Sequence, residues 1–231
     1  MKKETNLFKI EACIGTLQSG IEAEKGGANR VELCDNLAEG GTTPSAALIQ
    51  MTKEKLEIPA AVMIRPRHGD FLYSDLEFEI MKKDIEFCKS VGVEAVVFGL
   101  LTPDGQIDCQ RTMRLVESAG NMQVCFHRAV DLSRDYFEAI EQIINCGCTR
   151  ILTSGGANKA IEGFKNIKRA QELYGNKIEI MVGSGINAEN VSKFYEIGIR
   201  NFHLSGKVQI DSLMTYRKEG VSMGAISAEE E

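Results

Sequence analysis

The sequence lacks the features that would place a protein in a membrane or direct it out of the cell. It contains no tryptophan and no apolar run near the ~18–20 residues that a membrane-spanning helix requires. The basic start at Lys2 and Lys3 is not followed by the apolar core of a signal peptide, because Lys9 and Glu11 interrupt it. We therefore expect a cytoplasmic protein without a membrane anchor.

Basic runs are also missing. The 231 residues carry a formal net charge of −6, which is spread along the chain. Neither a nucleic acid nor an anionic membrane surface is therefore an expected partner. Hydrophobic residues make up 43% of the chain and charged residues 26%. This balance is typical of a globular domain that buries a full core.

Paired cysteine motifs are absent, although the chain has seven cysteines. An odd number without C-x-x-C spacing predicts free thiols in a reducing compartment, where they serve as core residues, metal ligands or nucleophiles. Cys146 and Cys148 form a lone C-x-C motif after a predicted helix. We interpret them as two small apolar residues at a tight turn rather than as a metal site.

Short β-rich runs alternate with segments of helical period along most of the chain. The β-rich runs cover residues 7–13, 30–34, 60–65, 93–99, 122–128, 148–154, 177–183 and 199–205. The helical segments cover residues 15–25, 45–55, 75–91, 108–119, 135–145, 159–173 and 188–197. Asp75, Asp108 and Asp135 are the expected N-caps of three of these helices.

Eight β-rich runs that alternate with helical segments predict an α/β fold, a single (β/α)8 TIM barrel over residues 1–217. The residues 218–231 are expected to form a flexible acidic tail. A doubly wound open sheet is the alternative. It would usually carry a glycine-rich phosphate loop after its first strand, and the turn from Ile14 to Thr16 has no such motif.

The alternation of apolar residues along each run predicts which side chains face the barrel lumen. Apolar residues must face the helices, so charged residues between them point inward. The inward set then includes three acids and three basic or imidazole side chains: Glu11, Glu32, Glu179, Arg65, His127 and His203. Buried charges persist only when they are paired, so a network is expected. It is either a polar core that satisfies itself or part of a functional site.

Cys13 and Cys34 end the first two β-rich runs on the inward face. Adjacent strands lie ~4.8 Å apart, so two inward thiols at matching heights can converge on one metal ion. A soft thiolate pair suits Cu(I) best and Zn(II) second. The alternative is that both cysteines are small buried residues that line the lumen.

The turns after the last predicted strands suit a phosphate or another anion. Small residues there leave backbone N–H groups exposed, as in barrels that bind phosphate after strands seven and eight. The candidates are Gly183, Ser184, Gly185, Ser205, Gly206 and Lys207. The alternative is that tight turns simply require glycine.

Acid–base residues cluster at the predicted strand ends. His127, Arg128 and Asp131 follow the fifth run, and together with Arg65 they could bind a carboxylate or phosphate. His127 suits a general base near neutral pH, or else it is a hydrogen-bonded core histidine. The candidates for catalytic roles are thus Glu11, Glu32, Arg65, His127, Arg128 and Asp131.

Four long motifs resemble those of the CutC copper homeostasis protein family. They are VELCDNLAEGGTTPS (31–45), MIRPRHGDFLYSD (63–75), FHRAVD (126–131) and RILTSGG (150–156). The resemblance extends from about Glu11 to Met223. It implies a TIM barrel, a cytoplasmic protein, a role in copper handling and homo-oligomers, either dimers or tetramers. Two positions depart from the family pattern, since His68 replaces a glycine and Cys125 replaces a threonine, and each adds a potential soft ligand.

Two functions remain open on this basis. The first is a cytoplasmic copper protein that binds Cu(I) through Cys13 and Cys34. The second is an uncharacterised TIM-barrel enzyme acting on a small metabolite that bears a phosphate or carboxylate.

Overall fold

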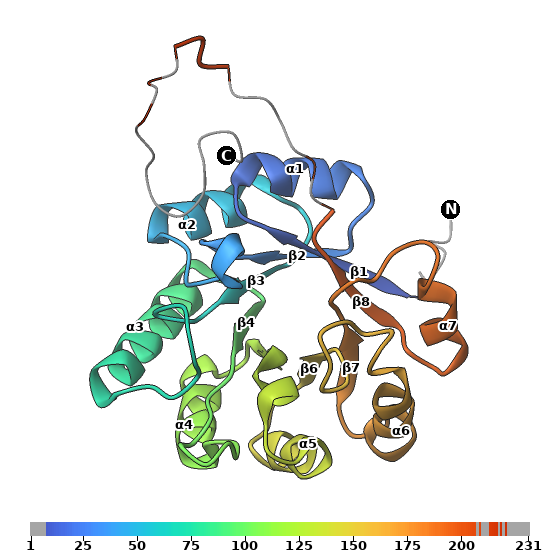
Figure 1. Ribbon diagram of the computed structural model, residues 1–231. Coiled ribbons are helices and arrows are strands. Elements are labelled where there is room, and N and C mark those ends of the chain that lie inside the picture. Colours follow the sequence, from blue (N-terminus) through green and yellow to red (C-terminus); the bar gives the residue numbers. More distant parts are fainter. Residues whose placement is uncertain (1–7, 207, 209–212, 217, 219, 221–231) are drawn as a thin grey trace.

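The computed structural model describes residues 8–206, 208, 213–216, 218 and 220. Eight parallel strands close into a barrel in sequence order, with β8 paired to β1 (Figure 1). The predicted TIM-barrel architecture is confirmed. The strands are β1 (Lys9–Ile14), β2 (Arg30–Leu33), β3 (Ala60–Met63), β4 (Ala95–Phe98), β5 (Gln123–Phe126), β6 (Arg150–Thr153), β7 (Glu179–Val182) and β8 (Asn201–Leu204).

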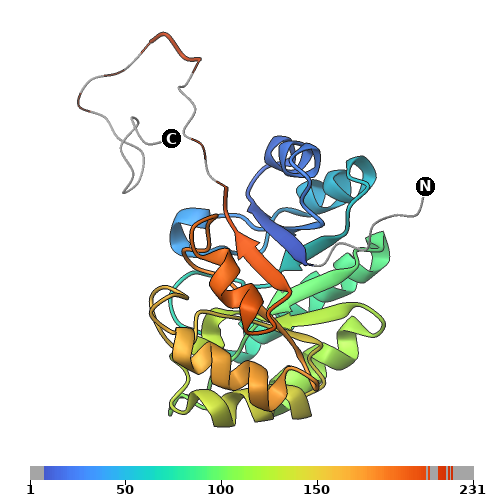
Figure 2. The ribbon, with the colours of Figure 1, turned by 90° about the vertical axis from the view of Figure 1, so that its right-hand side faces the viewer.

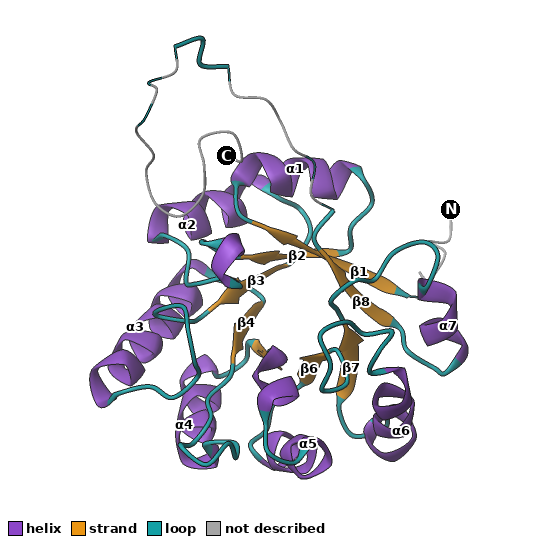
Figure 3. Cartoon of the chain, in the orientation of Figure 1, coloured by secondary structure: helices purple, strands orange, loops and turns teal. Residues whose placement is uncertain are grey.

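Helices surround the strands, as Figure 3 shows. They are α1 (Leu17–Lys25), α2 (Ala46–Lys55), α3 (Asp75–Val91), α4 (Cys109–Ala119), α5 (Tyr136–Asn145), α6 (Phe164–Tyr174) and α7 (Val191–Glu196), with 3-10 turns η1 (Leu37–Glu39) and η2 (Arg128–Leu132). Within the described residues, no helix follows β8. β8 pairs with β1, and the two strands lie next to each other between α1 and α7 (Figure 2). None of the described helices is long and apolar enough to cross a membrane.

Two of the three predicted N-caps are confirmed. Asp108 accepts a hydrogen bond from the N–H of Arg111, and Asp135 caps α5 in the same way. The prediction for Asp75 is wrong, because this residue is the first of α3 and Ser74 is the cap. Ser74 and Glu77 exchange side-chain-to-backbone hydrogen bonds, so that two free helix N–H groups are satisfied at once.

Two apolar clusters fill the barrel. The larger lies between the outer face of the strands and the helices, and it includes Val31, Val62 and Phe126. The smaller lies in the lumen, around Met63, Cys125, Leu152 and Met181 among others. The two sets alternate along the strands, which is the pattern that the inward and outward assignment predicted.

Charged side chains close the barrel at the N-terminal end of the strands. The carboxylate of Glu11 is completely buried, contacts Arg30 Nε and lies 4.0 Å from Arg150 Nη1. Arg150 also bonds Glu179 at 2.8 Å and Gln123 at 2.9 Å. The ion pairs join strands from opposite sides of the lumen. Glu11 and Glu179 therefore have structural partners below the barrel mouth.

The domain boundary at residue 217 stays a prediction. The last strand ends at Leu204. The predicted acidic tail, apart from Lys218 and Gly220, lies outside the described residues.

Candidate metal centre

Two thiols meet at the C-terminal ends of β1 and β2. The sulfur atoms of Cys13 and Cys34 lie 3.9 Å apart, and neither cysteine is in a disulfide. They are not at matching heights, since the strand register places Glu32 opposite Cys13 and Cys34 lies two residues further on. The convergence of the thiols thus depends on a diagonal contact between neighbouring strands.

An acid–imidazole pair lies beside the thiols. His203 Nε2 on β8 is 2.7 Å from Glu32 Oε2, and the Glu32 side chain is almost completely buried. Among the described residues, the other oxygen, Oε1 of Glu32, has no hydrogen-bond partner. One ligand atom each of Cys13, Glu32 and His203 lies within 4.8 Å of the others. Three adjacent strands therefore bring three different metal-binding groups together.

Hydrogen bonds and neighbouring charges favour the ionised form of Cys13 and the protonated form of His203. Hydrogen bonding to the Cys34 thiol, opposed by burial, lowers the pKa of Cys13. The same hydrogen bond, together with burial, raises the pKa of Cys34 well above its usual value. Burial alone would lower the pKa of His203, but the Glu32 carboxylate and hydrogen bonds raise it well above its ordinary value. Cys13 is thus the more acidic thiol of the pair.

His127 lies at the end of β5 with one nitrogen free. The backbone N–H of Ala129 donates to Nδ1 at 3.2 Å, so the neutral ring carries its proton on Nε2. Nε2 is buried and has no partner among the described residues. Burial, reinforced by the positive charge of Arg65, lowers the pKa of His127 to about 4. A Cβ atom at Gly99 would lie 2.5 Å from Nδ1, so this close packing requires glycine.

Arg65 holds loops together. Its guanidinium donates to the carbonyl oxygens of Glu39 and Gly41 at 2.9 and 2.8 Å, and to that of Gly69 at 2.8 Å. It also lies over the ring of Phe71, 5.0 Å from the centroid. These contacts shape the rim of the mouth.

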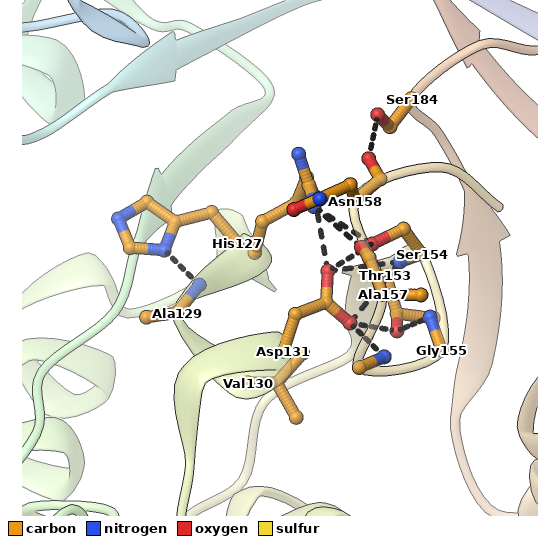
Figure 4. Close-up of polar contacts among 12 residues, drawn as sticks. His127, Ala129, Val130, Asp131, Thr153, Ser154, Gly155, Ala157, Asn158 and Ser184 are labelled. Atoms are coloured by element: carbon orange, nitrogen blue, oxygen red, sulfur yellow. Dashed lines mark hydrogen bonds and ion pairs between the residues drawn. The ribbon is translucent and has the colours of Figure 1, made fainter. Parts of the chain in front are cut away.

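Asp131 is held by donors from η2 and from the turn after β6 (Figure 4). It accepts hydrogen bonds from Thr153 Oγ1 at 2.6 Å, from the N–H of Ser154 at 2.9 Å and from the N–H of Gly156 at 2.9 Å. The Ser154 hydroxyl donates at 2.8 Å and Arg128 Nε at 3.0 Å. The Asp131 carboxylate thus accepts hydrogen bonds from the backbone N–H groups of this turn, in the position that a bound anion would take.

A cavity of about 1050 Å³ opens at the mouth above these groups. It is lined by the thiols and by Glu32, His127, Arg128 and His203, among others. Of the six anion candidates, Ser184, Gly185, Ser205 and Gly206 line it, whereas Gly183 packs against His203. Lys207 lies outside the described residues. A small ligand in this cavity can therefore reach both the metal-ligand candidates and the anion-binding candidates.

Ser184 adopts a backbone conformation that serine rarely takes. Its φ of 72° lies in the left-handed region, and its hydroxyl donates to the carbonyl of Asn158 at 2.6 Å (Figure 4). Such a conformation costs of order 1–3 kcal/mol. The tie to Asn158 helps to hold this turn open at the edge of the cavity.

Comparison with known proteins places this site in a family. The sequence model of the CutC family matches residues 8–208. The chain belongs to the CutC family. The family protein CutC of Chromobacterium violaceum is 47% identical over 222 residues, which cover 96% of this chain and 90% of that protein. The human copper homeostasis protein cutC homolog is 45% identical, over 95% of this chain and 81% of its own length.

Solved structures agree. The crystal structure of the putative copper homeostasis protein CutC from Streptococcus agalactiae has a TM-score of 0.81 and 39% identity, and it covers 85% of this chain and 97% of that one. A dihydrodipicolinate synthase from Bacillus anthracis has a TM-score of 0.63 at 11% identity, over 87% of this chain and 71% of that one. The latter likeness concerns the barrel fold alone.

The two residues that depart from the CutC pattern lie apart from the thiol pair. Cys125 belongs to the apolar cluster of the lumen, and burial raises its pKa well above the usual value. His68 lies on an exposed loop, 3.7 Å from Glu39. Among the described residues, neither joins the group formed by Cys13, Glu32 and His203.

Sequence reasoning missed two features of this CutC site. Arg150 was not assigned to the lumen, although the alternation in Arg150–Thr153 places it there by the same rule. His203 was assigned to the lumen but not to the metal or catalytic candidates. Its contact with Glu32 joins residues that are far apart in the chain, and no local motif signals it.

Proposed function

We propose that this CutC protein takes part in copper homeostasis in the cytoplasm by binding Cu(I) through the thiolates of Cys13 and Cys34. The 3.9 Å separation of the two sulfur atoms is the observation that carries the proposal. Soft thiolates select Cu(I) over harder cations. The human relative's name, copper homeostasis protein cutC homolog, supports the same role.

The surroundings of the thiols fit this use. Cys13 is half-buried and Cys34 is buried, yet both line the cavity at the mouth. Cys13 is the more acidic thiol, because hydrogen bonding to Cys34 lowers its pKa. Binding of a soft cation removes the remaining proton, so the affinity rises with pH until both thiols are ionised.

A titration with Cu(I) against a colorimetric chelator tests the proposal. We expect the Cys13→Ser/Cys34→Ser double variant to lose the tight site, because no second thiol pair within the described residues shares this cavity. Cys109→Ser is the matched control, since it removes a half-buried thiol on α4, outside the barrel. Unchanged Cu(I) affinity in the double variant would contradict the proposal.

A second candidate function is an enzyme that acts on a small anionic metabolite. The observation that favours it is His127 Nε2, a buried donor that has no partner among the described residues and lies at a cavity that Arg128 also lines. Arg128 pairs with Asp131 and Glu32 pairs with His203, but both line the cavity, so together with His127 they carry this alternative. The anion would bind at the turns 183–185 and 205–207.

Thermal-shift titration with inorganic phosphate, phosphorylated sugars and small carboxylates tests this alternative. We expect a saturable rise in melting temperature with one of these anions. Arg128→Gln should abolish the rise, because it removes a partly exposed guanidinium that lines the cavity, and Arg169→Gln on the exposed face of α6 should not. A rise that persists in Arg128→Gln would contradict the assigned site. The homo-oligomer stays a prediction.

A further inference from the structure

The ligand atoms at the mouth form two overlapping sets that share Cys13. One is the Cys13–Cys34 pair. The other is the trio of Cys13, Glu32 and His203, whose ligand atoms lie within 4.8 Å of one another. Cys34 is outside that group although its sulfur lies 3.9 Å from the sulfur of Cys13. We propose that the trio is a Zn(II) site, which shares only Cys13 with the copper pair. The proposal rests on the proposed function only in that Cys13 serves both ions.

The chemistry of the two sets differs. A thiolate, a carboxylate and an imidazole are the mixed sulfur, oxygen and nitrogen ligands that Zn(II) accepts. Two thiolates alone favour Cu(I). The trio with a thiolate, a carboxylate and a neutral imidazole carries a charge of −2, which a divalent ion neutralises. A monovalent ion on the trio would leave buried negative charge, which is unfavourable.

Glu32 supplies a second, independent observation. Its Oε1 atom is buried and, within the part of the chain that the structure describes, accepts no hydrogen bond. A buried carboxylate oxygen without a donor is unfavourable unless something else satisfies it. The remaining oxygen contacts His203 at 2.7 Å, so the Glu32–His203 pair satisfies only half of this carboxylate. A cation beside Cys13 would satisfy the free oxygen.

Little has to move to admit the ion. Ligand atoms about 2.0–2.3 Å from a tetrahedral zinc lie ~3.4–3.6 Å from one another. The 2.7 Å Glu32–His203 contact therefore opens by less than an ångström, and the other pairs, which lie within 4.8 Å, close by at most about 1.2 Å. The protons on His203 and on any protonated Cys13 leave to solvent as the metal bonds form. The three residues lie on adjacent strands β8, β1 and β2, which hold ligands more rigidly than loops do.

The number of protein ligands indicates the class of site. Structural zinc sites use four protein ligands, whereas catalytic ones use three and leave a position open. All three residues of the trio line the cavity at the mouth, so the open position faces a space that admits a small molecule. The proposed ion is therefore exchangeable and can bind a water or an anionic ligand.

The proposal is tested with variants that should each weaken the binding of one metal and leave the binding of the other unchanged. The full chain is prepared metal-free under reducing conditions and titrated with Zn(II), with Co(II) as a spectroscopic probe, and with Cu(I) against a chelator. We expect Glu32→Gln and His203→Gln each to weaken Zn(II) binding at least ~10-fold and to change Cu(I) binding by less than about 3-fold. Cys34→Ser should do the reverse. Cys13→Ser should weaken both.

Matched controls come from the exposed rim. Glu39→Gln and His68→Gln alter a carboxylate and an imidazole that are exposed and outside the trio, so Zn(II) affinity should not change. Melting curves of every variant establish that it is folded. In the unaltered protein, the sulfur-to-cobalt charge-transfer band should have the intensity of one thiolate, and this readout needs no variant.

Two results would overturn the proposal. One is Zn(II) affinity that is unchanged in both folded variants, Glu32→Gln and His203→Gln. The other is a Co(II) band with the intensity of two thiolates, which would make the four residues one site. If the unaltered protein binds Zn(II) but not Cu(I), only the proposed function is contradicted. If it binds Cu(I) but not Zn(II), only this inference is contradicted.

Discussion

At the scale of single residues, burial decides the charge state of His127. Its pKa is lowered to about 4, against an unfolded value near 6.5. Between these two values the unfolded chain binds more protons than the folded one, so stability rises with pH in this window and falls as the solution is acidified. The ring is therefore neutral at physiological pH and presents a donor, Nε2, to the cavity.

The pH dependence of unfolding tests this charge state. From pH 6.5 down to pH 4, His127 should remove about 3 kcal/mol of stability, because each pKa unit corresponds to ~1.4 kcal/mol. His127→Gln should lack this component, whereas His68→Gln, on the exposed loop, should keep it. Urea unfolding across the range measures the difference. Identical slopes for the unaltered protein and His127→Gln would contradict the prediction.

At the scale of elements, a capping box fixes the start of α3. The stretch from Ser74 to Glu77 satisfies the Ser-x-x-Glu spacing of a capping box, and the structure forms that box. Asp75 was predicted as the cap because it is also a good capping residue. Ser74 and Asp75 are both good capping residues, and the hydrogen bond between the Glu77 side chain and the Ser74 N–H identifies Ser74 as the cap.

Removing this cap should destabilise the barrel modestly. Ser74→Ala is expected to lower the free energy of unfolding by about 1 kcal/mol, since the N–H of Glu77 loses its acceptor. Ser90→Ala, near the other end of α3, removes only a hydroxyl that donates to the carbonyl of Phe87. Chemical denaturation compares the two. If both variants lose the same free energy of unfolding, the capping box contributes no more to stability than the Ser90 hydroxyl does.

At the scale of the whole molecule, the buried ion network joins the two sides of the lumen. Glu11 on β1 lies between Arg30 on β2 and Arg150 on β6. Replacing a buried acid leaves its cationic partners without compensation, which costs far more than loss of a surface pair. The network therefore supports the mouth from below.

Glu11→Gln should consequently lower the free energy of unfolding by roughly 3–5 kcal/mol. Glu179→Gln is the matched control, because its side chain is 30% exposed and water can replace part of the lost interaction. Urea denaturation of both variants provides the measurement. A loss in Glu11→Gln no larger than that in Glu179→Gln would contradict a central role for Glu11.

The sequence by itself determined the barrel, the alternation of its strand residues and the family, because period, turn residues and long motifs are local in the chain. It also indicated that Cys13 and Cys34 face the lumen. Only the tertiary structure decided that Glu32 lies opposite Cys13, that His203 reaches Glu32 and that Asp131 occupies the turn after β6. These contacts depend on strand register and barrel closure, which bring together residues separated by up to most of the chain.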